Sequence, residues 1–151
     1  MRLTRQSSYA IRTLIYCAVN DQGLSRVADI AKAHGISELF LFKLIKPLVD
    51  HGLIETVRGR KGGIRLGRPA SEITLLDTIR LTEDGFTMAE CFEEGDISCP
   101  LAGACDVNSA LKEALGAFFE VLERYTIADL ADNRRAIRQR LGIAPGIMLA
   151  N

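Results

Sequence analysis

Long apolar runs are missing from this chain of 151 residues. No stretch approaches the roughly 20 consecutive apolar residues that a membrane-spanning helix needs. The N-terminal segment also lacks the apolar core of a secretory signal peptide. These two absences predict a cytoplasmic protein that has no membrane partner.

Histidine is scarce, since the chain contains only His34 and His51. Both lie near the ends of predicted helices and outside the segment in which most of the cysteines are found. A redox or metal-handling enzyme would need a catalytic base beside a substrate pocket. The sequence offers no such arrangement and therefore predicts a protein that is not an enzyme.

The whole chain carries no net charge, but each of its two halves does. Residues 1–70 contain 12 Lys and Arg against 5 Asp and Glu, a surplus of seven positive charges. Residues 71–151 contain 7 against 14, an equal surplus of negative charges. This asymmetry predicts that the basic half binds a polyanion. The alternative is chance clustering of solvated surface charge.

The basic half has the pattern of a winged helix-turn-helix. Apolar periodicity predicts a first helix over about 4–20 and two further helices that meet at Gly35. Ser25 and Ser37 are the predicted caps of those two helices. Two short strands, over 53–57 and 64–66, surround a glycine-rich turn and predict a hairpin, the wing. The predicted fold class is mainly α with a small β-hairpin.

The acidic half predicts one short helix, a loop and a long helix. Thr74 is the expected cap of a helix over about 75–81, in which Leu75, Ile79 and Thr82 face inward. A long helix over 107–125 has a continuous apolar face, which predicts pairing with a second copy of the chain. Covering its own core is the alternative. The predicted organisation is a winged helix-turn-helix domain at 1–70, a linker helix and cysteine-bearing loop at 71–106, a dimerisation helix with a short following helix at 107–132, and a solvated, partly helical tail at 133–151.

Double-stranded DNA is the predicted polyanion. The second helix of a helix-turn-helix enters the major groove, where Lys43 could bond a guanine or a phosphate. Phe40 either contacts a thymine methyl or packs against the core. Arg58 and Arg60 of the wing are expected at the minor groove or the backbone, and a solvated turn is the alternative. The predicted DNA-binding residues are Arg2, Ser37, Glu38, Phe40, Lys43, Arg58, Arg60 and Lys61.

Three of the four cysteines share one acidic loop, as Cys91-x7-Cys99-x5-Cys105. The fourth, Cys17, is predicted to be a small buried residue of the first helix. The loop spacing is not CxxC, so it fits a zinc ribbon or a thioredoxin motif poorly. Three thiols in one loop favour a metal site over unpaired structural thiols. By themselves they do not distinguish zinc from an iron–sulfur cluster.

Taken together, these motifs resemble the iron–sulfur winged-helix repressors of bacteria, the family of IscR, NsrR and RirA. The resemblance covers about residues 1–132 and includes the three-cysteine loop. Within the family the chain is most similar to the RirA branch of rhizobial iron regulators, through SELFLFK at 37–43, ETVRGR at 55–60 and MAECFE at 88–93. The other matching stretches are MRLT at 1–4, YA at 9–10, VADIA at 27–31, GIS at 35–37, GL at 52–53, VRG at 57–59, GG at 62–63 and YTIADL at 125–130.

The resemblance implies a homodimeric repressor of iron-uptake genes whose sensor is an iron–sulfur cluster on the three loop cysteines. A [4Fe–4S] cluster is expected, with [2Fe–2S] as the alternative. A nitric-oxide-sensing or cluster-biogenesis regulator of the same family is the first alternative function. A DNA-binding protein with a structural zinc is the second.

The fourth ligand of such a cluster departs from the patterns of the family. Some relatives use a histidine three residues after the last cysteine, where this chain has Asn108. Others use an aspartate of the first helix, at the position of Ser8. Neither residue is present here, so Ser8, Asn108 and Asp106 are the candidate fourth ligands.

Overall fold

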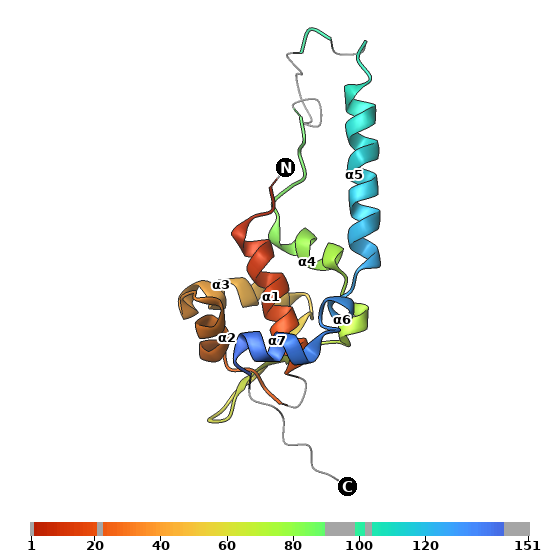
Figure 1. Ribbon diagram of the computed structural model, residues 1–151. Coiled ribbons are helices and arrows are strands. Elements are labelled where there is room, and N and C mark those ends of the chain that lie inside the picture. Colours follow the sequence, from red (N-terminus) through yellow and green to blue (C-terminus); the bar gives the residue numbers. More distant parts are fainter. Residues whose placement is uncertain (1, 21–22, 90–98, 102–103, 144–151) are drawn as a thin grey trace.

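The computed structural model describes residues 2–20, 23–89, 99–101 and 104–143. Within these residues the chain is mainly helical with one two-stranded antiparallel sheet, which confirms the predicted fold class (Figure 1). None of the described helices combines the length and hydropathy that crossing a bilayer requires. The elements are α1 (Arg5–Val19), α2 (Val27–His34), α3 (Glu38–Asp50), β1 (Ile54–Val57), β2 (Gly63–Leu66), the 3-10 turn η1 (Ala70–Glu72), α4 (Leu75–Thr82), α5 (Val107–Arg124), α6 (Ile127–Leu130) and α7 (Arg134–Leu141).

The helix-turn-helix is formed by α2 and α3, as the sequence predicts. Gly35 ends α2 with φ at 64°, a left-handed conformation that glycine adopts at little cost. The Ser37 side chain then accepts a hydrogen bond from the Phe40 backbone N–H and caps α3. The predicted cap and the predicted turn are both confirmed.

Ser25 does not cap α2, so this prediction is wrong. Arg26 is the N-cap residue and makes no side-chain cap bond. The backbone of Ser25 pairs instead with Ile64 of β2 through two hydrogen bonds of 2.8 Å. A side chain at Gly63 would leave no room for this pairing, since its Cβ would lie 2.7 Å from the Ser25 carbonyl oxygen. Ser25 therefore extends the wing as a third, one-residue strand.

The core is built around α1, which packs against α3, α4, α6, α7 and β2. Its apolar face buries Ala10, Leu14 and Val19 completely. Burying apolar side chains on several sides of one helix provides the main driving force for folding. The largest fully buried apolar side chains of the molecule are Leu14, Val19, Ile30, Leu41, Leu48, Ile54, Ile73, Ile79 and Ile127.

The C-terminal end of the long helix α5 is attached to this core at a defined point. Leu75 donates to the Tyr125 carbonyl, and Ile127 donates to the Ile73 carbonyl, both at 2.8 Å. Thr74 and Thr126 each head a capping box, on α4 and α6. In α4 the buried side chains are Leu76, Thr78, Ile79 and Thr82, whereas Leu75, predicted to face inward, is only half-buried. These backbone pairs hold the end of α5 beside the start of α4.

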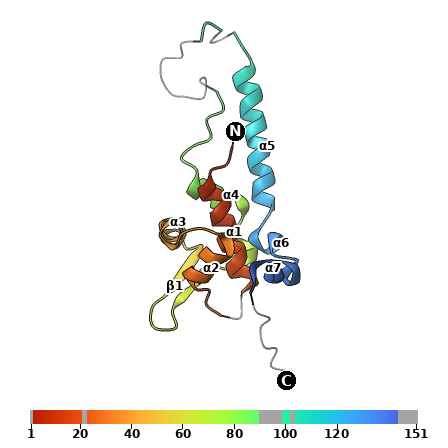
Figure 2. The same ribbon diagram turned by 60° about the vertical axis from the view of Figure 1, so that its left-hand side comes forward.

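The N-terminal part of α5 projects away from the body of the molecule (Figures 1 and 2). None of its residues is buried. Val107 and Val121 on the helix are 52% and 42% exposed, and Tyr125 at its end is 50% exposed. The apolar face that the sequence predicts is therefore present, and this chain covers it only in part.

The segment 134–141 is helical, in line with the prediction of a solvated, partly helical tail, and none of its residues is fully buried. It forms α7, which packs against α1. The guanidinium groups of Arg134 and Arg138 donate to the Ala18 and Val19 carbonyls at 2.9 and 2.7 Å. A helix leaves its last four carbonyls without partners inside the helix. Here two arginines from α7 supply these partners, and their positive charge suits the C-terminal end of α1.

Replacing either arginine by alanine should destabilise the protein. Loss of a hydrogen bond from a charged donor costs about 1.5–3 kcal/mol. We expect Arg134→Ala and Arg138→Ala each to lower the free energy of unfolding by about this amount, measured by urea unfolding followed by circular dichroism. Arg135→Ala, at an exposed position of the same helix, is the control and should change it by less than about 0.5 kcal/mol. Equal effects of all three would contradict a specific role at the end of α1.

Candidate DNA-binding surface and cysteine loop

The exposed face of α3 carries most of the predicted recognition residues. Ser37, Glu38 and Lys43 are exposed. Phe40 is half-buried, and its ring lies edge-on to Tyr9 of α1, with 5.8 Å between the ring centroids. Of the two roles predicted for Phe40, the structure shows the packing role.

Two apolar side chains on the same helix were not among the predicted DNA-binding residues. Leu39 is 69% exposed and Phe42 is 55% exposed. The other large apolar side chains of α2 and α3 are buried or half-buried. The signal was available, because Leu39 and Phe42 lie off the buried periodic face that Leu41, Leu44 and Leu48 define.

The wing presents three cations at its tip. Arg58, Arg60 and Lys61 are all exposed, and none of them takes part in an ion pair within the described residues. The turn between the strands is tight, since a Cβ on Gly62 would lie 2.4 Å from the Val57 carbonyl oxygen. The tip of the wing therefore combines three exposed positive charges with a tight backbone turn.

The recognition helix and the wing share one side of the molecule. In Figure 2, α3 and the hairpin project on the same side, away from α5, α6 and α7. Arg2, the remaining predicted DNA-binding residue, is exposed on the N-terminal segment before α1. The fold thus gathers the predicted cations of α3 and the wing on a surface that α5 does not cover.

The cysteines fall into different environments. Cys91 lies outside the described residues, so the structure does not describe the full predicted ligand set. Cys99 is half-buried, Cys105 is exposed, and both are free thiols. Within the described part of the chain, no three potential metal ligands come together.

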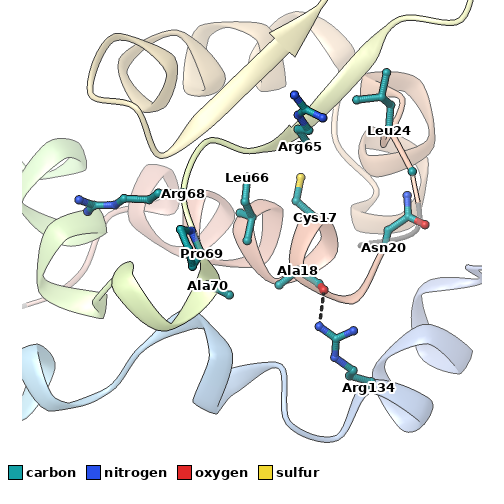
Figure 3. Close-up of a pocket in the computed structure, with 11 residues that line it drawn as sticks. Cys17, Ala18, Asn20, Leu24, Arg65, Leu66, Arg68, Pro69, Ala70 and Arg134 are labelled. Atoms are coloured by element: carbon teal, nitrogen blue, oxygen red, sulfur yellow. Dashed lines mark hydrogen bonds between the residues drawn. The ribbon is translucent and has the colours of Figure 1, made fainter.

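Cys17 is buried in α1, as the sequence predicts, beside a cavity of about 560 Å³ (Figure 3). Burial raises the pKa of the Cys17 thiol to about 12, against the opposing effect of a hydrogen bond with Ser25. Three arginines line the cavity, but each is engaged elsewhere: Arg65 with Glu55, Arg68 with Asp77, and Arg134 with the Ala18 carbonyl. Burial and the raised pKa of its thiol both agree with the predicted role of Cys17 as a small buried residue of α1.

The three candidate fourth ligands lie in two places. Asp106 is exposed at the N-cap of α5, and Asn108 is half-buried in its first turn, close in sequence to Cys105. Ser8 is half-buried on α1, in the body of the molecule. Both views show the N-terminal end of α5 projecting away from that body (Figures 1 and 2). Within one chain, Ser8 is therefore remote from Cys105.

One carboxylate joins the start of α1 to the segment that leads into the cysteine loop. Glu83, the C-cap residue of α4, accepts hydrogen bonds from the Thr4 backbone N–H at 2.7 Å and from the Thr4 hydroxyl at 3.0 Å. The Ser7 hydroxyl also donates to Glu83 and lies 2.7 Å from the Thr82 hydroxyl. Partial desolvation raises the pKa of Glu83, but the hydrogen bonds from Ser7 and Thr4 outweigh it, and the pKa lies below its ordinary value.

A second contact ties the following segment to α5. Phe86 lies edge-on to Phe119 with 4.8 Å between the ring centroids, and the Arg80 guanidinium lies 5.5 Å from the Phe119 centroid. The chain on its way to the cysteine loop is thus held both to α1, through Glu83, and to α5, through Phe86. No local motif marks either contact in the sequence.

The arrangement can be compared with known proteins. A family model described as "Rrf2: Iron-dependent Transcriptional regulator" matches residues 3–133. The chain belongs to the Rrf2 family. This confirms the family to which the sequence motifs point.

Individual relatives agree with this membership. Protein aau3 of Rhizobium meliloti is 60% identical over 143 residues, which are 95% of this chain and 93% of that protein. The HTH-type transcriptional regulator NsrR of Geobacillus kaustophilus is 41% identical, over 93% of this chain and 97% of that one. The structure of CymR, the global cysteine regulator of Bacillus subtilis, is similar with a TM-score of 0.71 and 27% identity, covering 87% of this chain and 97% of that chain.

This Rrf2-family chain is a DNA-binding transcriptional regulator. The named relatives NsrR and CymR are regulators, which confirms the prediction that the protein is not an enzyme.

The Glu83 contact should make stability depend on pH. Its pKa is lowered in the folded state, so its contribution is present above the unfolded pKa of about 4.3 and is lost as pH falls through the lower folded value. We expect Glu83→Gln to be less stable than the wild type at pH 7, with the gap closing between about pH 5 and pH 3. Asp84→Asn, at the exposed neighbouring position, is the control in the same urea titrations. A gap that persists unchanged at low pH would contradict a role for the carboxylate charge.

The thiols should differ sharply in reactivity. With a pKa of about 12, Cys17 is almost entirely protonated at pH 8, and burial also blocks access. In metal-free protein treated with iodoacetamide, we expect Cys105 to be alkylated while Cys17 stays unmodified, as read by peptide mass spectrometry. In urea all cysteines should react. Native labelling of Cys17 as fast as that of Cys105 would show the assignment to be wrong.

Proposed function

We propose that this Rrf2-family protein is an iron-responsive repressor that binds its operator as a homodimer in the cytoplasm. Its sensor is an iron–sulfur cluster, [4Fe–4S] rather than [2Fe–2S], held by Cys91, Cys99 and Cys105. The observation that carries the proposal is the presence of two free loop thiols, the half-buried Cys99 and the exposed Cys105, in a chain whose family model is described as iron-dependent.

The donor set is suited to such a cluster. Thiolates are the usual ligands of iron–sulfur clusters, and the two described loop thiols are free and reachable. Burial and a raised pKa make the Cys17 thiol a poor candidate ligand beside the loop thiols. When bound, the cluster would make the state of the protein depend on iron, because the protein can exist with or without its full complement of cluster iron. Asp106 and Asn108 are the fourth-ligand candidates nearest in sequence to Cys105.

A second copy of the chain is the proposed partner of α5. The helix has no buried residue, yet it carries the half-buried rings of Phe118 and Phe119 beside the exposed Val121. An apolar face of this length is costly to leave in water. Pairing two copies through residues 107–132 would present two winged helices, at 1–70, to the two halves of a palindromic site. Residues 71–106, which contain the three cysteines, then connect the winged helix to the dimerisation helix.

Iron sensing follows from the weakness of the fourth donor. The chain offers three thiolates, and neither Ser8 nor Asn108 is a strong fixed ligand. The fourth iron position should therefore fill and empty with the free iron concentration by mass action. Iron can shift DNA affinity only if the two occupancy states bind DNA differently. The contacts of Glu83 with Thr4 and of Phe86 with Phe119 provide a route from the loop to α1 and α5.

The test follows the cluster and the DNA together. Full-length protein is purified anaerobically, and a binding site is selected from random duplexes. A mild ferrous chelator is then added while the visible spectrum and the anisotropy of the labelled duplex are recorded. We expect the cluster absorbance and the bound DNA to be lost together, because the iron-loaded form is the tight-binding form.

Variants make the test specific. Cys99→Ala and Cys105→Ala should prevent cluster assembly, whereas Cys17→Ala should keep the chromophore. DNA affinity that stays constant while the cluster disappears would refute iron sensing. Resistance to the chelator combined with collapse on stoichiometric nitric oxide would favour the nitric-oxide-sensing alternative. A colourless anaerobic protein containing zinc would favour the structural-zinc alternative.

A further inference from the structure

Two large apolar side chains stand exposed on the recognition helix. Leu39 and Phe42 are more exposed than any other large apolar side chain of α2 and α3. Folding gains little from them, since they bury little surface. Their exposure is explained if a ligand covers them when the protein works.

The two side chains form one small patch. They are three residues apart on a helix, so they lie on the same face and are offset by about 4.5 Å along its axis. Lys43 and Lys46 are exposed on that face as well, and Lys46 is paired with Asp50 at 2.8 Å. The base pairs of B-DNA are stacked about 3.4 Å apart. The patch can therefore meet neighbouring or next-neighbouring base pairs.

The surrounding charge identifies the occupant as DNA. The patch lies beside Lys43, and the wing on the same side of the molecule carries Arg58, Arg60 and Lys61 (Figure 2). A second copy docked on this face would bring the same cations against each other, which is unfavourable. Phosphates flanking the major groove attract these cations. An apolar patch surrounded by cations is complementary to the major groove of DNA, where thymine methyl groups lie between the two phosphate backbones.

We propose that Leu39 and Phe42 select thymines in the operator by packing on their C5-methyl groups in the major groove. Thymine alone among the four bases presents a methyl group there, and apolar side chains are its natural contacts. The inference rests on the proposed function as a DNA-binding repressor and assigns the apolar part of its specificity. It gives Leu39 and Phe42 the role that the sequence offered to Phe40, which is packed on Tyr9.

The experiment removes single methyl groups from the DNA. A site is selected from random duplexes with the full-length protein, and each thymine is then replaced by deoxyuridine, which keeps every hydrogen-bonding group. Binding is measured by anisotropy at fixed salt. Burying one methyl group is worth about 0.8 kcal/mol. We therefore expect about fourfold weaker binding at one or two thymines in each half-site.

Protein variants assign the effect to a side chain. At each sensitive thymine, the deoxyuridine penalty should vanish in either Leu39→Ala or Phe42→Ala, because the methyl has lost its contact. Lys43→Ala is the matched control on the same face: it should weaken both duplexes equally and keep their ratio. Thermal melts by circular dichroism should show that the two apolar variants fold, as expected for exposed positions.

The outcomes separate this inference from the proposed function. Equal binding of thymine and deoxyuridine duplexes at every position would overturn the inference while leaving DNA binding intact. A penalty that persists unchanged in both apolar variants would also overturn it. Failure of the selection to enrich any sequence would instead overturn the proposed function, and this inference with it.

Discussion

The central helix α1 is held at both ends by side chains that follow it far along the chain. At its start, Glu83 accepts the hydrogen bonds of Thr4 and Ser7. At its end, Arg134 and Arg138 donate to the carbonyls of Ala18 and Val19. The ends of a helix need such partners, and the charges here match the helix dipole, with the anion at the start and the cations at the end. Because the core packs around α1, these contacts tie the DNA-binding half to the C-terminal half.

The exposed apolar side chains divide mainly between two surfaces. Val107 and Val121 lie on α5, with Tyr125 at its end, whereas Leu39 and Phe42 lie on α3. The first surface is long and projects from the body, which suits a second copy of the chain. The second is small and bordered by cations, which suits a nucleic acid. Exposed apolar area thus suits different partners on the two surfaces, because the surrounding charge and shape differ.

The cysteines illustrate how environment decides the chemistry of one residue type. Cys17 is enclosed in α1, where burial holds its proton. Cys105 lies just before α5 and is exposed. An accessible thiol loses its proton more readily than one buried in apolar surroundings. Glu83 and Phe86 lie in the segment that leads into the acidic loop, and they contact the start of α1 and the long helix α5.

Local order was readable from the amino-acid sequence because it depends on neighbouring residues. The caps at Ser37 and Thr74, the stop at Gly35, the hairpin and the apolar face of α5 all follow from short-range patterns. The basic wing and the three-cysteine loop were visible in the same way. These features carried the fold class and the candidate site.

Tertiary structure alone decided the partners of residues distant in sequence. Ser25 joins β2 instead of capping α2, since its backbone meets Ile64. The tail docks because its arginines find the open carbonyls of α1, and Phe40 turns inward because Tyr9 lies beneath it, which leaves Leu39 and Phe42 at the surface. Hydrogen bonding and burial are properties of a three-dimensional environment. A periodic pattern shows which residues can be buried, but only the packed chain shows what covers them.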